Sequence, residues 1–266
     1  MGNVYEALRQ AEMDTANSGS AVRQEWTSRD VPEPLVFPSN ALEGTPTLRS
    51  EDAIDHRLVT MSDERGGGAE QFRILSVRLR DQRKQAGLRK ILVTSSVPGE
   101  GKSVVAANLA VSLARSVGEN VLLLGGDLLS PGLNRLLGCN GIPGIHEYLS
   151  SNQSYIKYVY RVAPFSLWFL PPGKTFGRVN ILESARLKDL VESLSASFDW
   201  VVIDSPPLLP LADASVWARM VDGVLLVVRE GKTSKKRLQR AISSLGSVQL
   251  LGVVVNDCSH ATADGY

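Results

Sequence analysis

The sequence predicts a three-layer α/β domain in which helices cover both faces of a mostly parallel sheet. Over about residues 70–260, short runs rich in Val, Ile and Leu alternate with helical stretches. Strands buried on both faces of a parallel sheet have this continuous apolar character, and the alternation with helices is typical of parallel topologies. The chain has 266 residues, 43% hydrophobic and 21% charged, which is enough for a sizeable core.

Six apolar runs predict the strands. Each has the length of a buried strand, far below the roughly 18 apolar residues of a membrane span. In chain order they lie at 90–94, 121–124, 166–170, 200–204, 223–228 and 250–255. We expect the second strand to lie beside the first.

Helical patterns separate these runs. They cover residues 70–85, 102–117, 181–194 and 234–245. In the first of them, the apolar positions Phe72, Leu75, Val77 and Leu79 fit a helical stripe only in part.

The composition divides the chain into four segments. Residues 1–13 predict a short amphipathic helix, and residues 14–68, rich in Ser, Asp, Glu, Gly and Pro, predict a flexible linker. Residues 69–258 form the predicted α/β domain, and residues 259–266 form a C-terminal tail.

Charge and cysteine content exclude several classes of protein. There are 29 Lys+Arg and 28 Asp+Glu, a net charge of +1, which argues against a nucleic-acid partner. The two cysteines, Cys139 and Cys258, are too few for a disulfide scaffold or a zinc cluster. The amino terminus has no signal-peptide pattern, so the sequence predicts a soluble, cytoplasmic protein.

The run SSVPGEGKS at 95–103, between a predicted strand and a predicted helix, has the form of a phosphate-binding loop. Gly99 and Gly101 let backbone N–H groups approach phosphates, Lys102 supplies a cation for the terminal phosphates, and Ser103 a hydroxyl for Mg²⁺. The opening glycine of the general pattern is replaced here by Ser96, and the alternative is a glycine-rich turn with a chance Lys-Ser. The predicted ATP-binding residues are Ser96, Pro98, Gly99, Glu100, Gly101, Lys102, Ser103, Val104 and, further along the chain, Asn256.

Two aspartates follow predicted strands and are candidates to hold Mg²⁺ together with Ser103. Asp204 ends the strand WVVID, and parallel strands end at the same edge as the phosphate loop; the alternative is a turn or helix cap. Asp127 follows VLLLGG and either supplies a second carboxylate near the phosphates or caps the turn before Pro131. We predict that Lys102, Asp127 and Asp204 carry the chemistry.

Two further features have alternative explanations. Asn256 follows the last strand, where it can bond the adenine edge or cap a turn. Basic side chains crowd residues 232–240, and we favour a solvated helix face over a contact with an anionic lipid surface or acidic partner.

The loop and the two aspartates, with the segments around them, resemble the bacterial tyrosine kinases, P-loop proteins paired with polysaccharide chain-length regulators in capsule and exopolysaccharide export. The resemblance spans about residues 66–257 and includes PGEGKS, DWVVIDSPPLLPLADA and LGVVVND. It implies a P-loop NTPase fold, Mg-ATP binding, tyrosine as phosphoryl acceptor, a membrane chain-length regulator as partner, homo-oligomers, and a place at the inner membrane through that partner.

The chain departs from the family pattern at several positions. The family's second motif has Asp-x-Asp followed by Arg, whereas this chain has Gly125 and Leu129 at the first Asp and the Arg. The first Asp is held to activate the tyrosine hydroxyl, so its loss predicts impaired catalysis. The tail carries Tyr266 in place of a tyrosine cluster, and Ser76 stands where a repeated Glu-x-x-Arg-x-x-Arg pattern has its second Arg. Three tyrosines at 155–160 also group together, and we favour aromatic residues on or beside a strand.

We therefore predict a protein-tyrosine autokinase of exopolysaccharide or capsule biosynthesis. The second hypothesis is a catalytically weak, nucleotide-dependent switch that regulates a membrane chain-length partner. The third, a partition-type ATPase, would need a Lys near the front of the loop, where Ser96 and Val97 stand.

Overall fold

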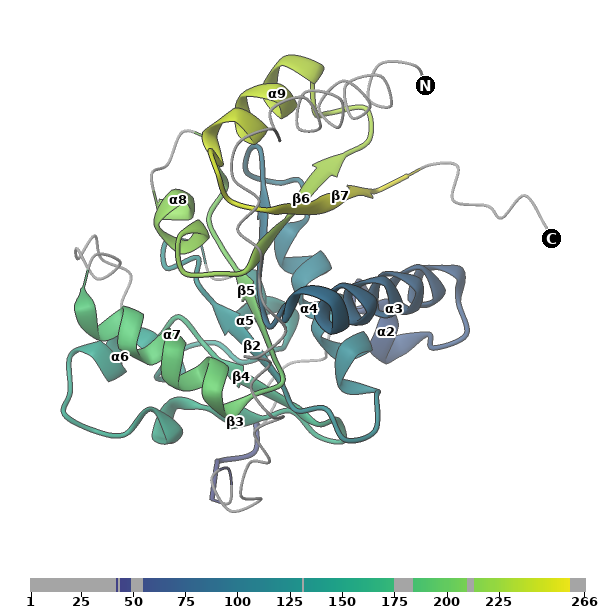
Figure 1. The fold of residues 1–266 in the computed structure, drawn as a ribbon. Coiled ribbons are helices and arrows are strands. Elements are labelled where there is room, and N and C mark those ends of the chain that lie inside the picture. The colour runs from purple at the N-terminus through teal and green to yellow at the C-terminus, as the bar shows by residue number, and fades with distance from the viewer. Residues whose placement is uncertain are drawn as a thin grey trace.

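The structure, a computed structural model, confirms the predicted three-layer α/β fold (Figure 1). It describes residues 42, 44–48, 55–130, 132–174, 184–209 and 213–258. The sheet has seven strands in the order β3-β4-β2-β5-β1-β6-β7, and every pairing is parallel except that of β3 with β4.

All six predicted strands are present, with ends that differ by at most one residue. The strands are β1 (Lys90–Ser95), β2 (Val121–Gly125), β3 (Tyr160–Arg161), β4 (Leu167–Leu170), β5 (Trp200–Asp204), β6 (Gly223–Arg229) and β7 (Leu250–Asn256). The additional strand β3 has only two residues, too few for an apolar pattern, and pairs antiparallel with β4. The prediction that the second strand lies beside the first is wrong, because β5 lies between β2 and β1. Strand composition carries no signal of this order.

The four predicted helices are also present, and short ones join them. The helices are α2 (Val59–Ser62), α3 (Gly67–Ala86), α4 (Lys102–Ala114), α5 (Gly132–Leu136), α6 (Ile145–Leu149), η1 (Tyr155–Tyr158), α7 (Ala185–Ser197), α8 (Asp213–Ala218) and α9 (Lys235–Ser244). The helix predicted to run to residue 117 ends at Ala114, because the chain turns there toward Gly118, whose φ is +85°. The short helices have too few turns for a helical period to be visible in sequence.

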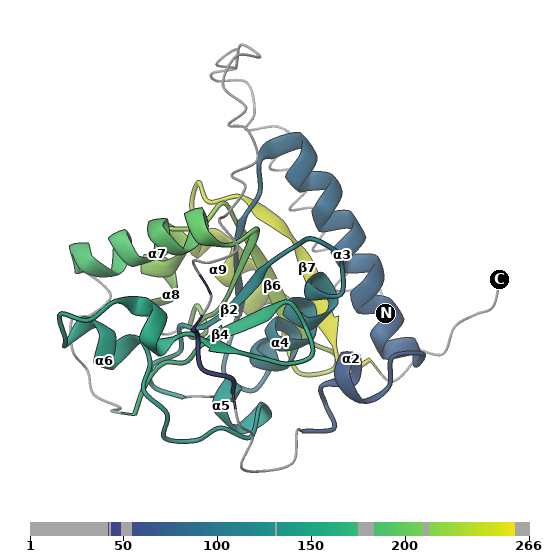
Figure 2. The same ribbon diagram turned by 90° about the horizontal axis from the view of Figure 1, so that it is seen from below.

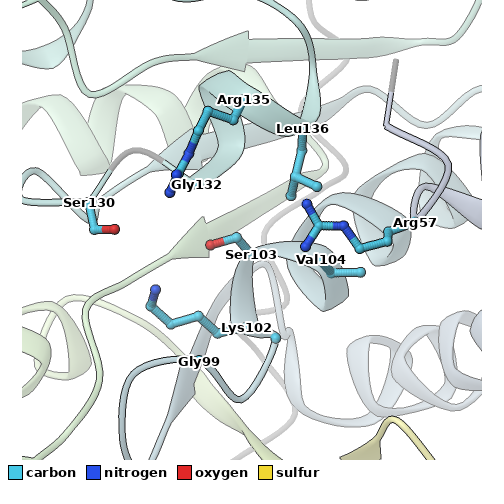
Figure 3. A pocket seen from close by; sticks show the side chains of 10 residues that line it. Arg57, Gly99, Lys102, Ser103, Val104, Ser130, Gly132, Arg135 and Leu136 are labelled. Carbon is cyan, nitrogen blue, oxygen red and sulfur yellow. The ribbon is translucent and has the colours of Figure 1, made fainter. Parts of the chain in front are cut away.

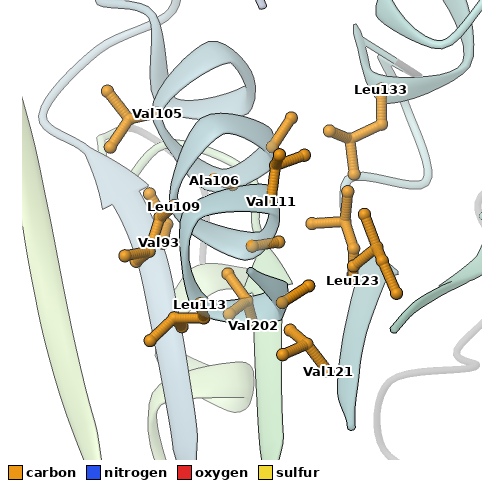
Figure 4. Packing of buried hydrophobic residues seen from close by; sticks show 14 of the residues in the cluster. Val93, Val105, Ala106, Leu109, Val111, Leu113, Val121, Leu123, Leu133 and Val202 are labelled. Atoms are coloured by element: carbon orange, nitrogen blue, oxygen red, sulfur yellow. The ribbon is translucent and has the colours of Figure 1, made fainter. Parts of the chain in front are cut away.

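Two hydrophobic clusters lie on opposite faces of the sheet. Helices α3 and α4 cover one face and α7, α8 and α9 the other, as the two views in Figures 1 and 2 show. Successive strand residues alternate between the clusters, so that Leu92 belongs to one and Val93 to the other. Leu109 and Leu113 of α4 pack against the strands in Figure 4. This packing fixes the helix whose first turn carries Lys102.

Part of the predicted linker packs against the domain. Leu58 is fully buried, and both the amide and the hydroxyl of Thr60 donate to Oδ1 of the buried Asn108, at 3.0 and 2.9 Å. The packed domain therefore begins before residue 69. Residues 1–13, most of 14–54 and the tail 259–266 lie outside the described residues, so the predictions for them stay predictions. Among the described helices, none combines the length and the apolar character needed to cross a bilayer.

Candidate functional site

The glycine-rich loop joins β1 to α4 and leaves the first backbone N–H groups of that helix without intrahelical partners. Gly99 and Gly101 have φ of +84° and +95°, a conformation that other residues rarely adopt. A side chain at position 101 would also collide with the side-chain amide of Asn256. The loop thus has the glycines and the free N–H groups that bind phosphate at a helix N-terminus.

Lys102 lies between the two predicted carboxylates. Its Nζ is 2.9 Å from Oδ2 of Asp127, and both side chains are largely buried. Asp204 ends β5, directly opposite Gly125 at the end of β2, and is 1% exposed. Burial alone would lower the pKa of Lys102, but the charges of Asp204 and Asp127 outweigh it and raise the pKa above its ordinary value. The lysine is therefore held as a cation at the mouth of the loop.

Asp127 caps the turn after β2 and also faces Lys102, while its role near the phosphates stays a prediction. Its Oδ2 faces Lys102, while its Oδ1 accepts hydrogen bonds from the amides of Leu129 at 3.3 Å and Ser130 at 2.9 Å. Those two bonds cap the turn after β2 and fix the carboxylate. The turn therefore orients the group that meets the lysine.

The oxygen atoms at this position fit a magnesium nucleotide. Ser103, Asp127 and Asp204 are all buried, and Oδ1 of Asp204 has no hydrogen-bond partner among the residues that the structure describes. Burial raises the pKa of Asp204 to about 6, against the opposing effects of Lys102 and of a hydrogen bond from Ser103. A buried carboxylate oxygen without a partner is suited to a cation, and carboxylate and hydroxyl oxygens are the ligands that Mg²⁺ prefers. Of these three residues, Ser103 lines a cavity of about 310 Å³.

Other predicted loop residues shape the loop more than they face the cavity. Oε2 of Glu100, a buried side chain, accepts the amide of Val97 at 3.0 Å, and its Oε1 accepts the hydroxyl of Thr233. Asn256 donates its Nδ2 to the carbonyl of Glu100 at 3.0 Å. These contacts clamp the loop, so the adenine role of Asn256 stays a prediction, as do the roles of Ser96 and Pro98, which do not line the cavity. Val104 lines it.

Sequence reasoning missed half of the residues that line the cavity (Figure 3). These are Arg57, Ser130, Gly132, Arg135 and Leu136. Arg57 comes from the segment predicted as linker, and the others come from the turn before α5 or from α5 itself. In the sequence, the one local sign of this contact is the glycine at position 132. The structure requires a glycine there, because a Cβ at position 132 would lie 2.7 Å from Oγ of Ser103.

The departures at positions 125 and 129 have physical counterparts. A Cβ on Gly125 would lie 2.6 Å from Cδ of Pro172 and 3.1 Å from its backbone nitrogen. Leu129 is 43% exposed. The fold around β2 is therefore closed to a side chain at position 125, and the residue at 129 faces solvent.

The three grouped tyrosines at 155–160 lie on or beside a strand, which confirms the interpretation that the sequence favoured. Tyr160 is in β3, and Tyr155 and Tyr158 are in η1 just before it. The hydroxyl groups of Tyr155 and Tyr158 lie 2.9 and 3.0 Å from those of Ser197 and Ser151. These phenols are parts of the packing.

Comparisons with known proteins agree with this geometry. A ParA family model, described as NUBPL iron-transfer P-loop NTPase, matches residues 88–264. The chain is 30% identical over 206 residues to the tyrosine-protein kinase YwqD of Bacillus subtilis strain 168, covering 76% of this chain and 86% of that protein. It is 29% identical over 221 residues to the succinoglycan biosynthesis transport protein ExoP of Rhizobium meliloti strain 1021, covering 78% of this chain but only 28% of that protein.

A solved structure, the BceF tyrosine kinase domain, is also similar to this chain. The two are 32% identical with a TM-score of 0.67, and the match covers 74% of this chain and 81% of the other.

Proposed function

Because this chain belongs to the bacterial tyrosine-kinase family of ParA-type P-loop NTPases, we propose that it is an ATP-dependent protein-tyrosine kinase of exopolysaccharide or capsule biosynthesis. The observation that carries the proposal is the position of Lys102. Its ammonium lies beside the free N-terminus of α4, 2.9 Å from Asp127 and within the electrostatic reach of the buried Asp204. A polyphosphate with Mg²⁺ matches this arrangement of cation, N–H groups and carboxylates.

Each residue has a distinct part in this mechanism. When bound, Mg-ATP supplies the phosphoryl group that passes to a tyrosine oxygen. The backbone of 99–104 cradles the phosphates, Lys102 neutralises their terminal charge, and Ser103 with the two aspartates holds the metal. Phosphoryl transfer depends mainly on positioning and charge stabilisation, so these groups suffice to hold a nucleotide for reaction.

Mass spectrometry after incubation with Mg-ATP tests the activity. We expect phosphate on tyrosine in the wild type and none in Lys102→Ala, with calorimetry showing weaker ATP binding by the variant. Equal phosphorylation of tyrosine in Lys102→Ala and in the wild type would refute the assignment.

A second function, a nucleotide-dependent switch, is favoured by the packing at position 125. A Cβ at position 125 would lie 2.6 Å from Cδ of Pro172, which leaves no room for the carboxylate that would activate a tyrosine hydroxyl. A general base typically increases the rate about 10²–10⁴-fold. Without one, the chain should still bind ATP but should transfer phosphate slowly. ATP binding without phosphotyrosine, including in the presence of a membrane activator, would support the switch over the kinase.

We further propose a membrane chain-length regulator as the partner. The chain matches 28% of the length of ExoP, a succinoglycan biosynthesis transport protein. The basic side chains at 232–240 are exposed, and none forms an ion pair within the described part of the chain. They are Lys232, Lys235, Lys236, Arg237 and Arg240. Anionic lipid headgroups next to that partner fit this surface.

Homo-oligomers are also proposed, although one contact of the family pattern is absent. Glu70 and Arg73 pair on the exposed side of α3. Ser76, in the place of the next Arg, is buried and its hydroxyl lies 3.3 Å from that of Ser112 of α4. Any oligomer contact through this helix must therefore use other residues.

A further inference from the structure

The cavity beside the phosphate loop carries three cations. Lys102, Arg57 and Arg135 all line it, and none of its ten lining residues is acidic. A cavity with this charge suits a polyanion.

Two of the three cations already have carboxylate partners. Lys102 pairs with Asp127, and Arg57 pairs with Asp55, its Nη2 lying 2.7 Å from Oδ2 and its Nε 2.9 Å from Oδ1. Arg135 has no carboxylate within 4.0 Å and no side-chain hydrogen bond among the described residues. Its guanidinium is thus the cation that is free to meet a ligand.

The packing of α5 directs Arg135 toward the cavity. Leu133 and Leu136 are buried and anchor the helix, and Gly132, Arg135 and Leu136 line the cavity. Gly132 and Arg135, three residues apart, lie on the same side of the helix. At Gly132 the helix comes so close to Ser103 that a side chain would contact its hydroxyl. Figure 3 shows the side chains of Arg135, Ser103 and Lys102 pointing toward one another across the same space.

We propose that Arg135 binds the terminal phosphate of the nucleotide and so makes the site selective for ATP over ADP. The inference rests on the nucleotide-binding part of the proposed function. In a phosphate loop the lysine reaches the β- and γ-phosphates and the hydroxyl reaches their metal. Arg135 lies across the Ser103 hydroxyl from Lys102 (Figure 3). There it faces the position of the γ-phosphate, which ATP has and ADP lacks. Arginine also suits a phosphate because its fork of donors is bidentate.

Calorimetry on the full chain tests the proposal with two magnesium nucleotides, ADP and the non-hydrolysable ATP analogue AMP-PNP. A hydrogen-bonded charge pair is worth roughly tenfold or more in affinity. We therefore expect Arg135→Gln to weaken AMP-PNP binding about tenfold while the Kd for ADP changes less than about twofold. Arg135→Lys keeps the charge without the fork, and we expect an intermediate loss.

Arg57→Gln is the matched control, because it removes a cation from the same cavity that is already paired. It should change the ratio of the two affinities less than about twofold. Equal loss of both nucleotides in Arg135→Gln, no loss of either, or the same selective loss in Arg57→Gln would overturn the proposal. A chain that binds AMP-PNP in an Arg135-dependent way but forms no phosphotyrosine would overturn the kinase and leave this inference intact.

Discussion

The charge of Asp204 should make the metal-free protein less stable, and Asp204→Asn removes that charge. The side chain is 1% exposed, and within the described part of the chain its Oδ1 has no hydrogen-bond partner. Its pKa rises from 3.8 to about 6 on folding, which corresponds to about 3 kcal/mol of lost stability once the pH exceeds both values. A carboxyl group whose pKa is raised in the folded state destabilises progressively as the pH rises from about 4 to 6.

We expect Asp204→Asn to raise the stability of the metal-free protein by about 1–3 kcal/mol at pH 7.5, the upper value being the full pKa effect. That full effect already includes the attraction between the carboxylate and Lys102, which opposes the effect of burial. For a chain of this size that is roughly 2–10 °C in Tm. At pH 4.5 the gain should fall to about a third of its value at pH 7.5, because the folded carboxyl is then largely protonated while the unfolded one, with its pKa of 3.8, is still mostly ionised.

Differential scanning fluorimetry measures the stability of the metal-free protein in EDTA and then the stabilisation by saturating Mg-ATP. Saturating ligand at about 100 times its Kd adds about 2.7 kcal/mol, and the variant should lose most of this gain. Asp199→Asn is the matched control at the opposite end of β5, where the carboxylate is paired with Arg83 at 3.0 Å. It should lower the Tm slightly and leave the Mg-ATP effect unchanged. A lower Tm for Asp204→Asn in EDTA at pH 7.5 would refute the reasoning.

Three further outcomes are expected. Gly125→Asp alone should lower the free energy of unfolding in urea by about 1–3 kcal/mol, because it displaces Pro172, and it should not speed phosphotransfer. Combined with Pro172→Ala, it should speed phosphotransfer about tenfold or more over Pro172→Ala alone in a radiolabel assay. Faster phosphotransfer by Gly125→Asp alone would contradict the steric argument. Thr60→Val should destabilise by about 0.5–1.5 kcal/mol in the same unfolding assay, because Asn108 loses the hydrogen bond from the hydroxyl but keeps the one from the backbone amide of residue 60. An unchanged midpoint would show that residues 55–66 are not packed in solution. Replacing the five basic residues of 232–240 by Gln should abolish sedimentation with phosphatidylglycerol vesicles at low salt while ATP binding persists, and undiminished sedimentation would remove the lipid proposal.

The features that could be predicted from the sequence are those with a local signal. The strands at 121–124 and 200–204 are continuous apolar runs, and both Asp127 and Asp204 follow such a run. Because the carboxyl ends of parallel strands share one edge of the sheet, their meeting with Lys102 followed without any knowledge of strand order. The error in strand order consequently left the site prediction intact.

The features that were missed depend on contacts between distant parts of the chain. Arg57 and Arg135 lie on segments of low periodicity, and only the packing of α5 and of residues 55–66 against α4 brings them to the cavity. The obstruction at Gly125 likewise comes from Pro172, beyond the end of β4. A single sequence shows the glycine but not the proline that occupies its side-chain space.

The clamp on the phosphate loop has a consequence for the order of events during synthesis. The loop emerges from the ribosome well before the residues that hold it, Thr233 and Asn256, which both contact Glu100. Domains begin to fold from the N-terminus as the chain is made, yet a nascent chain that stops before β7 lacks the amide that rests on the loop. The contacts that hold the loop are therefore complete only when synthesis of the sheet is nearly finished.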